Sequence, residues 1–298
     1  MTKLRSNLNR STVPLRPFEE KRSRQKASIH ARFLLDALAR NPKNHGRWIV
    51  VLIDCPRSSL EGEYSVVSVA KKAAGRRAAE FVEDGMVCGL GTGSTIAFAL
   101  ERLAERVRDE KLRFCGVPTS LDTERKAKEL GFELRTLEEA PRLDLTIDGA
   151  DEVDPNFCLT KGGGGALLRE KVVAEASARE VICITNSKCV ERLGITFPLP
   201  VEVIPFARHV VARQIERLGA TCRTRMTSGK PVLTDNGNEI LDCTFSEGIE
   251  KPDLMDVVLN GIAGVVENGL FVDLAHVLVI AGEPADKGNE GQVEIRER

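Results

Sequence analysis

The sequence predicts an α/β protein built on a doubly wound parallel sheet, with a smaller α+β domain inserted before its C-terminal part. Three observations support this fold class. Strand-like and helix-like segments alternate regularly from about residue 66 to residue 185. Aromatic residues make up only 4% of the chain, so the core must be built from Val, Ile, Leu and Ala, as in buried parallel sheets. After about residue 197 the rhythm changes, which indicates a second unit.

The first part of the chain follows the βα pattern of a parallel sheet. Its predicted strands are Met86–Leu90, Phe114–Val117, Leu145–Asp148 and Val181–Thr185. Its predicted helices cover about 66–84, 95–109, 121–130 and 166–178, with Gly85 and Gly131 as stop signals. Such units predict strands joined by right-handed crossovers.

The second part predicts a β-α-β-β-α order, which is typical of a small α+β domain. The predicted elements are a strand at Val201–Ile204, a helix at 207–218, strands at 221–227, 231–234 and 239–243, and a helix at 253–260. Asp235-Asn236-Gly237 predicts the tight turn of a hairpin. Val265–Val272 and Val277–Ala281 are then expected to rejoin the first sheet. We therefore place one domain at 65–197 plus 266–298 and the small domain at 198–265.

Residues 1–64 are predicted to be a basic, disordered N-terminal extension with one plausible helix, Ala27–Arg40. Residues 1–63 hold 13 Lys/Arg against 6 Asp/Glu, which leaves a net charge of −8 on the remainder. Nucleic-acid binding or targeting by this extension is the alternative. The acidic body argues against a nucleic-acid partner, because phosphate contacts need a basic face. Acids at Glu19, Glu20 and Asp36 make an organelle transit peptide a minor hypothesis.

The cysteines and histidines argue against a disulfide framework and against a metal site. None of the eight cysteines forms a C-x-x-C pair, and most lie in apolar strand-like runs, which predicts buried free thiols in a reducing compartment. With only four histidines, a His-based metal centre is not expected. No apolar run approaches the ~20 residues of a membrane helix. We therefore expect a cytoplasmic protein with no membrane partner and no metal.

The turn Gly89-Leu90-Gly91-Thr92-Gly93-Ser94-Thr95 follows a strand and precedes a helix. At that position backbone N–H groups and a helix N-terminus converge on an anion, and the hydroxyls add donors for phosphate oxygens. The dinucleotide fingerprint fails because Ser94 takes its third glycine position, and the P-loop Gly-Lys-Ser/Thr is missing. Taken alone, the turn could be structural. Thr119-Ser120 at the end of the next strand suggests one site at this sheet edge.

A second segment combines acids, a lysine and glycines. Asp148-Gly149-Ala150-Asp151-Glu152-Val153-Asp154 could be a solvated loop or a divalent-metal site, but the EF-hand spacing is absent. Lys161 and four glycines at 162–165 follow, and consecutive glycines are costly unless the backbone must approach a ligand. A carboxylate such as Glu170, a lysine and an anion-binding glycine nest suit the transfer of a proton between C1 and C2 of a sugar. Alone, Glu170 would be a surface residue of a helix.

Together the two segments, GLGTGST and DGADEVD…KGGGGALLREK, resemble the ribose-5-phosphate isomerase A family. The resemblance continues through Thr185–Lys188, Phe197–Pro205, Thr234–Asn238 and Gly264–Phe271, and covers about residues 66–283. It implies a Rossmann-like domain with an inserted ferredoxin-like domain. It also implies the interconversion of ribose 5-phosphate and ribulose 5-phosphate through an enediolate, without a cofactor, in a homodimer or homotetramer.

The resemblance also implies roles for individual residues. Glu170 would be the proton-shuttling base, Asp148 and Asp151 would hold sugar hydroxyls and assist ring opening, and Lys161 would stabilise the oxyanion. The residues implied in substrate binding are Lys71, Thr92, Gly93, Ser94, Thr95, Gly149, Ala150, Gly162, Gly163, Gly164 and Lys188, with Lys72 as an alternative to Lys71. Two departures are the glycine at Gly165, often Ala or Cys in relatives, and the basic extension.

Two other functions remain open at this point. A phosphosugar-sensing module could share the Gly91–Thr95 cradle, but the N-terminal segment lacks a convincing pair of DNA-binding helices, and a pure binder would not need Glu170. An aminosugar-phosphate deaminase could use a similar scaffold, but it would want a histidine beside the acid, and none lies in these motifs.

Overall fold

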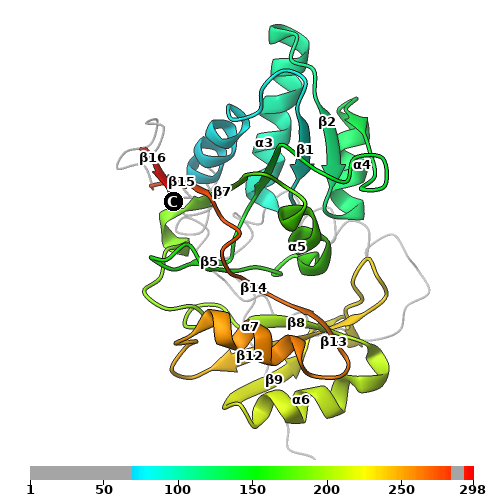
Figure 1. Ribbon diagram of the computed structural model, residues 1–298, viewed down its shortest axis with the longest axis vertical. Coiled ribbons are helices and arrows are strands. Elements are labelled where there is room, and N and C mark those ends of the chain that lie inside the picture. The colour runs from blue at the N-terminus through cyan, green and yellow to red at the C-terminus, as the bar shows by residue number, and fades with distance from the viewer. Residues whose placement is uncertain (1–68, 283–291) are drawn as a thin grey trace, which may run out of the picture. The chain divides into compact units, whose positions relative to one another are not determined.

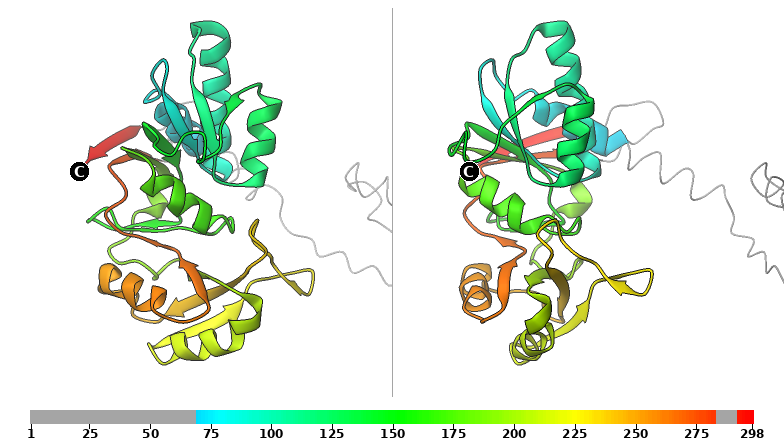
Figure 2. Two further views of the ribbon diagram at one scale, coloured as in Figure 1. Left: turned by 45° about the vertical axis from the view of Figure 1, so that its right-hand side comes forward. Right: turned by 90° about the vertical axis from the view of Figure 1, so that its right-hand side faces the viewer.

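A seven-stranded sheet forms the centre of the larger part of the structure (Figures 1 and 2). The computed structural model describes residues 69–282 and 292–298, so the expectations for residues 1–64 lie outside the described part. Strand order is β16-β15-β7-β4-β1-β2-β3, and only β16 runs antiparallel to its neighbour. The strands are β1 (Val87–Leu90), β2 (Cys115–Pro118), β3 (Glu133–Leu134), β4 (Leu145–Asp148), β7 (Glu180–Thr185), β15 (Val277–Ala281) and β16 (Val293–Glu297). The predicted parallel α/β sheet is confirmed.

Helices cover both faces of this sheet, which makes it doubly wound. They are the helix at 69–79, α3 (Ser94–Glu105), α4 (Leu121–Glu129) and α5 (Leu167–Glu175), and a π-helical turn, Arg106–Glu110, continues α3. Alternate residues of β7 separate the two cores. Val181 and Cys183 pack with the helix at 69–79, α3 and α4, whereas Ile182 and Ile184 pack on the α5 face. Glu170 is therefore carried on the α5 face of the sheet.

A second, antiparallel sheet has the order β13-β8-β12-β9 and packs against two helices (Figure 1). Its strands are β8 (Leu199–Val203), β9 (Ala220–Thr224), β12 (Glu239–Phe245) and β13 (Val265–Asn268), and its helices are α6 (Arg208–Glu216) and α7 (Pro252–Asn260). The turn predicted at Asp235–Gly237 forms, with Gly237 at φ 79°. The smaller elements are β5 (Glu152–Val153), β6 (Leu159–Thr160), β10 (Met226–Thr227), β11 (Lys230–Pro231) and β14 (Leu270–Phe271), with single 3₁₀ turns at Asn186–Lys188 and Pro205–Ala207.

The expectation that Val265–Val272 rejoins the first sheet is wrong. Its first half is β13, which pairs with β8 of the four-stranded sheet, and its second half is β14, which pairs with β6. Only Val277–Ala281 rejoins the seven-stranded sheet, as β15. A short apolar run specifies a strand but not its partner, which explains the error. We therefore propose a small domain that extends to Asn268, three residues beyond the predicted boundary.

The seven cysteines of the described part are all free. Cys88, Cys158, Cys183 and Cys243 are buried, as expected for thiols in apolar strands, whereas Cys189 is exposed. Within residues 69–282 and 292–298, no helix is long and apolar enough to cross a membrane.

Gly89 is required by the packing of β1 against α5. A Cβ at Gly89 would lie 2.0 Å from Thr146 Oγ1 and 2.5 Å from Val173 Cγ1. We expect Gly89→Ala to lower the free energy of unfolding by about 1–3 kcal/mol, because overpacking displaces the helix. Gly282→Ala is the control, since its Cβ would come no closer than 3.7 Å to another atom. Thermal unfolding of both variants checks this, and equal melting temperatures would contradict it.

Candidate active site

The Gly91–Thr95 cradle connects β1 to α3 at the carboxyl edge of the seven-stranded sheet. Gly93 has φ 121°, which only glycine adopts without strain, and α3 starts at Ser94. A Cβ at Gly91 would lie 2.2 Å from Asp148 Oδ1, so glycine lets the cradle approach the end of β4. The free N–H groups at the start of α3 make this turn suitable for an anion.

The hydroxyl of Thr92 points into a cluster of other hydroxyls. Its Oγ1 lies 2.8 Å from Thr119 Oγ1, 2.8 Å from Ser120 Oγ and 3.2 Å from Thr123 Oγ1. Its backbone N–H donates to Asp148 Oδ1 at 3.1 Å. The predicted proximity of Thr119 and Ser120 to the cradle is therefore found, but both are buried, and they contact the cradle through Thr92.

A buried ammonium group joins the acidic segment to α5. Lys161 Nζ lies 3.1 Å from Asp148 Oδ2 and 3.7 Å from Glu170 Oε1, and it donates to the Gly149 carbonyl at 2.5 Å. Lys161 is 2% exposed, Asp148 is fully buried, and Glu170 is 5% exposed. The ring of Phe271 lies 5.3 Å from the ammonium. Charges so far removed from water interact strongly.

The charge state of this cluster follows from its burial. Burial raises the pKa of Glu170 above the ordinary 4.5; the ammonium of Lys161 opposes this rise and the carboxylate of Asp148 adds to it. Burial disfavours the charge of Lys161, but Asp148 and Glu170 outweigh it and raise its pKa. Within the described protein, Oε2 of Glu170 has no hydrogen-bond partner. The arrangement therefore keeps a charged lysine beside a carboxyl group that can exchange a proton.

The glycine turn, Gly162–Gly165, lies beside the cluster. The N–H of Gly165 donates to the Gly162 carbonyl at 3.0 Å, and φ is 106° at Gly162 and 80° at Gly165. The N–H of Gly163 donates to Asp151 Oδ2 at 2.7 Å. A Cβ at Gly163 would lie 2.7 Å from Asp151 Oδ1, so this contact also requires glycine. The turn thus presents backbone donors beside Asp151.

Two further lysines complete the edge of the site. Lys71 Nζ donates to Ser94 Oγ at 3.0 Å, which places this ammonium at the cradle. Lys188 ends the 3₁₀ turn that follows β7, with its Nζ 5.9 Å from the ring of Phe197. Lys72 is exposed and does not line the cavity. Of the two adjacent candidates, the structure therefore places Lys71 at the site.

One cavity of about 270 Å³ brings nearly all of these residues together. It is lined by Lys71, Thr92, Gly93, Ser94, Thr95, Gly149, Ala150, Asp151, Lys161, Gly162, Gly163, Gly164, Glu170 and Lys188. Of the residues predicted for the site, only Asp148 is missing from this lining, because it lies beneath the cavity under Lys161. The cavity therefore combines ammonium groups, backbone donors and a carboxyl group, which suits a small polar anion.

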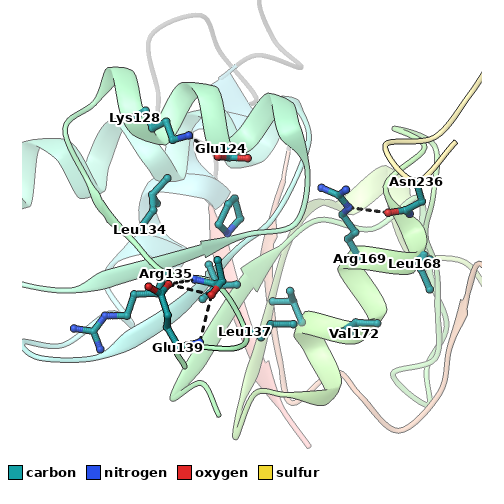
Figure 3. Close-up of a pocket in the computed structure, with 14 residues that line it drawn as sticks. Glu124, Lys128, Leu134, Arg135, Leu137, Glu139, Leu168, Arg169, Val172 and Asn236 are labelled. Atoms are coloured by element: carbon teal, nitrogen blue, oxygen red, sulfur yellow. Dashed lines mark hydrogen bonds and ion pairs between the residues drawn. The ribbon is translucent and has the colours of Figure 1, made fainter. Parts of the chain in front are cut away.

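A larger cavity of about 640 Å³ lies on another side of α5 (Figure 3). Leu168, Arg169 and Val172 of α5 face it, together with apolar side chains such as Leu134 and Leu137. Arg169 is bonded to Asn236 Oδ1 at 3.0 Å. None of the residues predicted for catalysis lines this cavity, and its walls are mainly apolar. We therefore place the chemistry in the smaller cavity.

The acidic segment is organised for hydrogen bonding. Asp148 accepts from the N–H groups of Thr92 and Gly149, and Asp151 accepts from Gly163. Glu152 is fully buried and holds the loop at 194–197 through three backbone N–H groups. Across residues 69–282 and 292–298, no three His, Cys, Asp or Glu side chains are grouped so that they could hold a metal ion.

Sequence reasoning missed two charged residues near the site. Glu180, at the start of β7, is fully buried, and burial raises its pKa to about 8, with Lys161 opposing and Asp148 adding to the shift. Arg225 contacts the glycine turn from the region between β9 and β10. The position of Glu180 directly before the apolar run Val181–Thr185 is only a weak indication that its carboxyl group is buried near the site. Nothing near Arg225 in the sequence indicates its contact.

Comparison with known proteins identifies the family of this chain. The family model described as ribose 5-phosphate isomerase A (phosphoriboisomerase A) matches residues 115–285. Ribose-5-phosphate isomerase A of Gloeobacter violaceus is 53% identical over 218 residues, covering 73% of this chain and 94% of the relative. The ribose 5-phosphate isomerase A structure from Methanocaldococcus jannaschii has 37% identity and a TM-score of 0.71, covering 77% and 98%. A D-ribose-5-phosphate isomerase in complex with phospho-erythronic acid has 37% identity and a TM-score of 0.73, covering 78% and 99%.

Glu180 makes a pH-dependent contribution to stability. Neither carboxyl oxygen has a hydrogen-bond partner among the described residues. The carboxyl group interacts electrostatically with Lys161, Asp148 and Glu170, and the backbone N–H of Glu180 donates to His276 Nδ1. Because the folded state raises this pKa from 4.5 to about 8, stability present below about pH 4.5 is lost as the pH rises through 8. We expect Glu180→Gln to melt about 5 °C or more above the unmodified protein at pH 9 and close to it at pH 5.

The exposed Glu175 provides the control for this stability prediction. Glu175→Gln makes the same change in net charge without relieving burial, so its melting temperature should follow the unmodified protein at both pH values. A Glu180→Gln variant with no advantage at pH 9 would show that the carboxylate is accommodated in the fold.

Proposed function

The chain belongs to the ribose 5-phosphate isomerase A family, and from its cavity we propose how its own residues carry out the reaction. The protein interconverts D-ribose 5-phosphate and D-ribulose 5-phosphate, an aldose–ketose isomerisation of the pentose phosphate pathway. The residue assignment rests on one observation. Glu170, Lys161 and the glycine turn line the same cavity as the Gly91–Thr95 cradle.

The cradle is proposed to bind the phosphate group. The N–H groups at the start of α3 and the hydroxyls of Ser94 and Thr95 supply donors, and Lys71 and Lys188 supply positive charge at the same cavity. Lys71 already contacts Ser94 Oγ. The phosphate would therefore fix one end of the sugar at the cradle and leave its C1–C2 end for the Lys161–Glu170 side of the cavity.

Glu170 is proposed to move the proton. As a carboxylate it would remove the proton from C2 of the open-chain aldose, which gives an enediolate, and return it to C1; transfer of the O2 hydroxyl proton to O1 completes the ketose. Its burial supports this role, because a raised pKa makes a carboxyl group both a stronger base and a competent acid near neutral pH. Glu170 lines the cavity, and its Oε2 makes no hydrogen bond within the described protein that would compete with the proton transfer.

Lys161 and the glycine turn are proposed to stabilise the enediolate oxygens. The ammonium is kept charged by Asp148, and it is shielded from water, so its attraction for a developing oxyanion is strong. Asp148 and Asp151 are proposed to hold sugar hydroxyls and to assist ring opening. For Asp148 that role would act mainly through Lys161, because Asp148 is buried beneath it.

Two alternatives are disfavoured by the same geometry. A phosphosugar sensor would not need a buried carboxyl group against a lysine, since burying both is costly without a catalytic function. An aminosugar-phosphate deaminase would want a histidine in the cavity. Neither described histidine is there: His276 bonds to the Glu180 N–H, and His209 lies on α6 beside Arg208.

We propose that the protein is a homodimer or homotetramer and that it acts in the cytoplasm. Large apolar side chains are strongly exposed near α6 and on α7, with Phe206 98% and Val257 69% accessible, which supports burial against another copy. The free cysteines support a reducing compartment.

Glu170→Gln tests both the activity and the base. The unmodified protein should convert ribose 5-phosphate to the ketose in the presence of EDTA. The variant should lose about 10²- to 10⁴-fold in kcat while it still binds substrate, because Gln cannot accept the proton. Colorimetric ketose detection and calorimetry with phosphosugar check the two parts. Absence of turnover by the unmodified protein would overturn the activity, and near-normal kcat in the variant would remove Glu170 as the base.

Lys71 and Lys72 form a matched pair for testing the cradle. Lys71→Met should raise KM for ribose 5-phosphate by about tenfold or more, since a charge-assisted contact to phosphate is lost. Lys72→Met should leave KM unchanged, because Lys72 does not line the cavity. Steady-state kinetics distinguish them, and equal KM values for the two variants would count against the assignment of Lys71.

A further inference from the structure

Arg225 of the small domain contacts the backbone of the glycine turn. It lies between β9 and β10 and does not line the substrate cavity. Its Nη1 donates to the Gly162 carbonyl at 2.7 Å and to the Gly163 carbonyl at 3.1 Å. Its other nitrogens bind Asp242 of β12, with Nε 3.0 Å from Oδ2 and Nη2 2.5 Å from Oδ1. One guanidinium group therefore links a strand of the small domain to two consecutive peptide carbonyls.

These two contacts determine where the following N–H groups point. In a planar trans peptide the C=O and N–H bonds are antiparallel. A carbonyl of Gly162 held toward Arg225 therefore directs the Gly163 N–H away from it, and the Gly163 carbonyl does the same for the Gly164 N–H. The Gly163 N–H donates to Asp151, which lines the substrate cavity. The Gly163 N–H is thus held on Asp151, and Gly164, which lines the same cavity, follows directly after it.

Glycine residues need such a constraint more than any others. Gly162 and Gly165 have φ values of 106° and 80°, and glycine loses more conformational freedom on ordering than other residues. The Gly162–Gly165 hydrogen bond closes the turn but does not orient the peptide between Gly163 and Gly164. Arg225 supplies the contact to that peptide, and its planar group is itself held by both oxygens of Asp242.

We propose that Arg225, oriented by Asp242, is a positioning residue that holds the glycine turn so that the Gly163 N–H orients Asp151 and the Gly164 N–H stabilises the enediolate. This inference rests on the proposed function of the glycine turn. Arg225 touches neither the substrate cavity nor the reacting atoms, so its effect passes through the backbone of Gly162 and Gly163. It assigns to the small domain a direct part in ordering the oxyanion donors.

Arg225→Met removes the guanidinium and keeps an apolar stem. We expect kcat to fall about 10- to 100-fold while KM for ribose 5-phosphate changes less than about threefold, because misdirected donors weaken the transition state more than the bound substrate. Affinity for phospho-erythronic acid, whose planar carboxylate resembles an enediolate, should fall in parallel with kcat. Affinity for inorganic phosphate, which needs only the cradle, should stay unchanged.

Arg208 provides the matched control. It forms an ion pair with Glu239 of the same sheet, at 2.6 Å, and contacts no glycine of the turn. Arg208→Met should therefore leave kcat and the affinity for phospho-erythronic acid unchanged. A fall in both affinities for Arg225→Met, or equal effects of the two variants, would show a general structural role and overturn the proposal. So would kcat within twofold of the unmodified enzyme.

A second pair of variants tests the proposal if Arg225→Met does not fold. Arg225→Lys keeps the charge but cannot bridge two carbonyls and a carboxylate, and Asp242→Asn weakens the orientation of Arg225. Both should lower kcat with little change in melting temperature, and combining Asp242→Asn with Arg225→Lys should cost less than the sum of the two. Additive losses or unchanged kcat would contradict the proposal. Because the unmodified enzyme is assayed alongside, failure of the isomerase function itself would be seen separately, as absence of turnover in every sample.

Discussion

The buried ammonium of Lys161 is the interaction on which the site depends. An isolated charge in this position would be very unfavourable, so its partners must come close from several directions. Asp148 reaches it from the end of β4, Glu170 from α5 and the Gly149 carbonyl from the loop between them. Phe271 of β14 closes the apolar side. Satisfying one ammonium therefore fixes the relative positions of a sheet edge, a helix and a strand, while Oε2 of Glu170 has no hydrogen-bond partner among the described residues.

Close approach of backbone to this charge cluster explains several of the glycines. A side chain at Gly91 would lie 2.2 Å from Asp148 Oδ1, and one at Gly269 would lie 2.3 Å from the Lys161 carbonyl. At Gly163 the obstacle would be Asp151. The space that a Cβ would occupy is thus taken by atoms of residues that we propose for catalysis. These positions require glycine because polar groups are packed closely around them, and not because the loops must be flexible.

The sequence predicted the larger sheet well, because it depends on local order, and the resemblance named most of the residues that line the cavity. Strands that alternate with helices place their carboxyl ends at one edge, so motifs after β1 and β4 must converge there. The partners of strands that are distant in the sequence were harder to predict, because β13 pairs within the four-stranded sheet and not within the larger one. Arg225 and Glu180 were not predicted for the same reason. Each interacts with a residue that is far away in the sequence. Resemblance to a family supplied the roles, whereas spacing alone left the acidic segment ambiguous.

The small domain contributes no side chain to the cavity lining, yet it contacts the segments that hold the site residues in several places. Pro200 of β8 lies against the position that a Cβ of Gly162 would take, at 3.1 Å. Glu202, two residues further along β8, accepts hydrogen bonds from Thr234 and Asn238 and so holds the turn whose Asp235 accepts from the Leu121 N–H of α4. Residues of the small domain therefore touch both the glycine turn and α4. A domain that only enlarged the core would not need these polar contacts, whose energetic value depends on geometry. These contacts run from the small domain to the backbone of the glycine turn and of α4, which supports a role of the small domain in ordering the site.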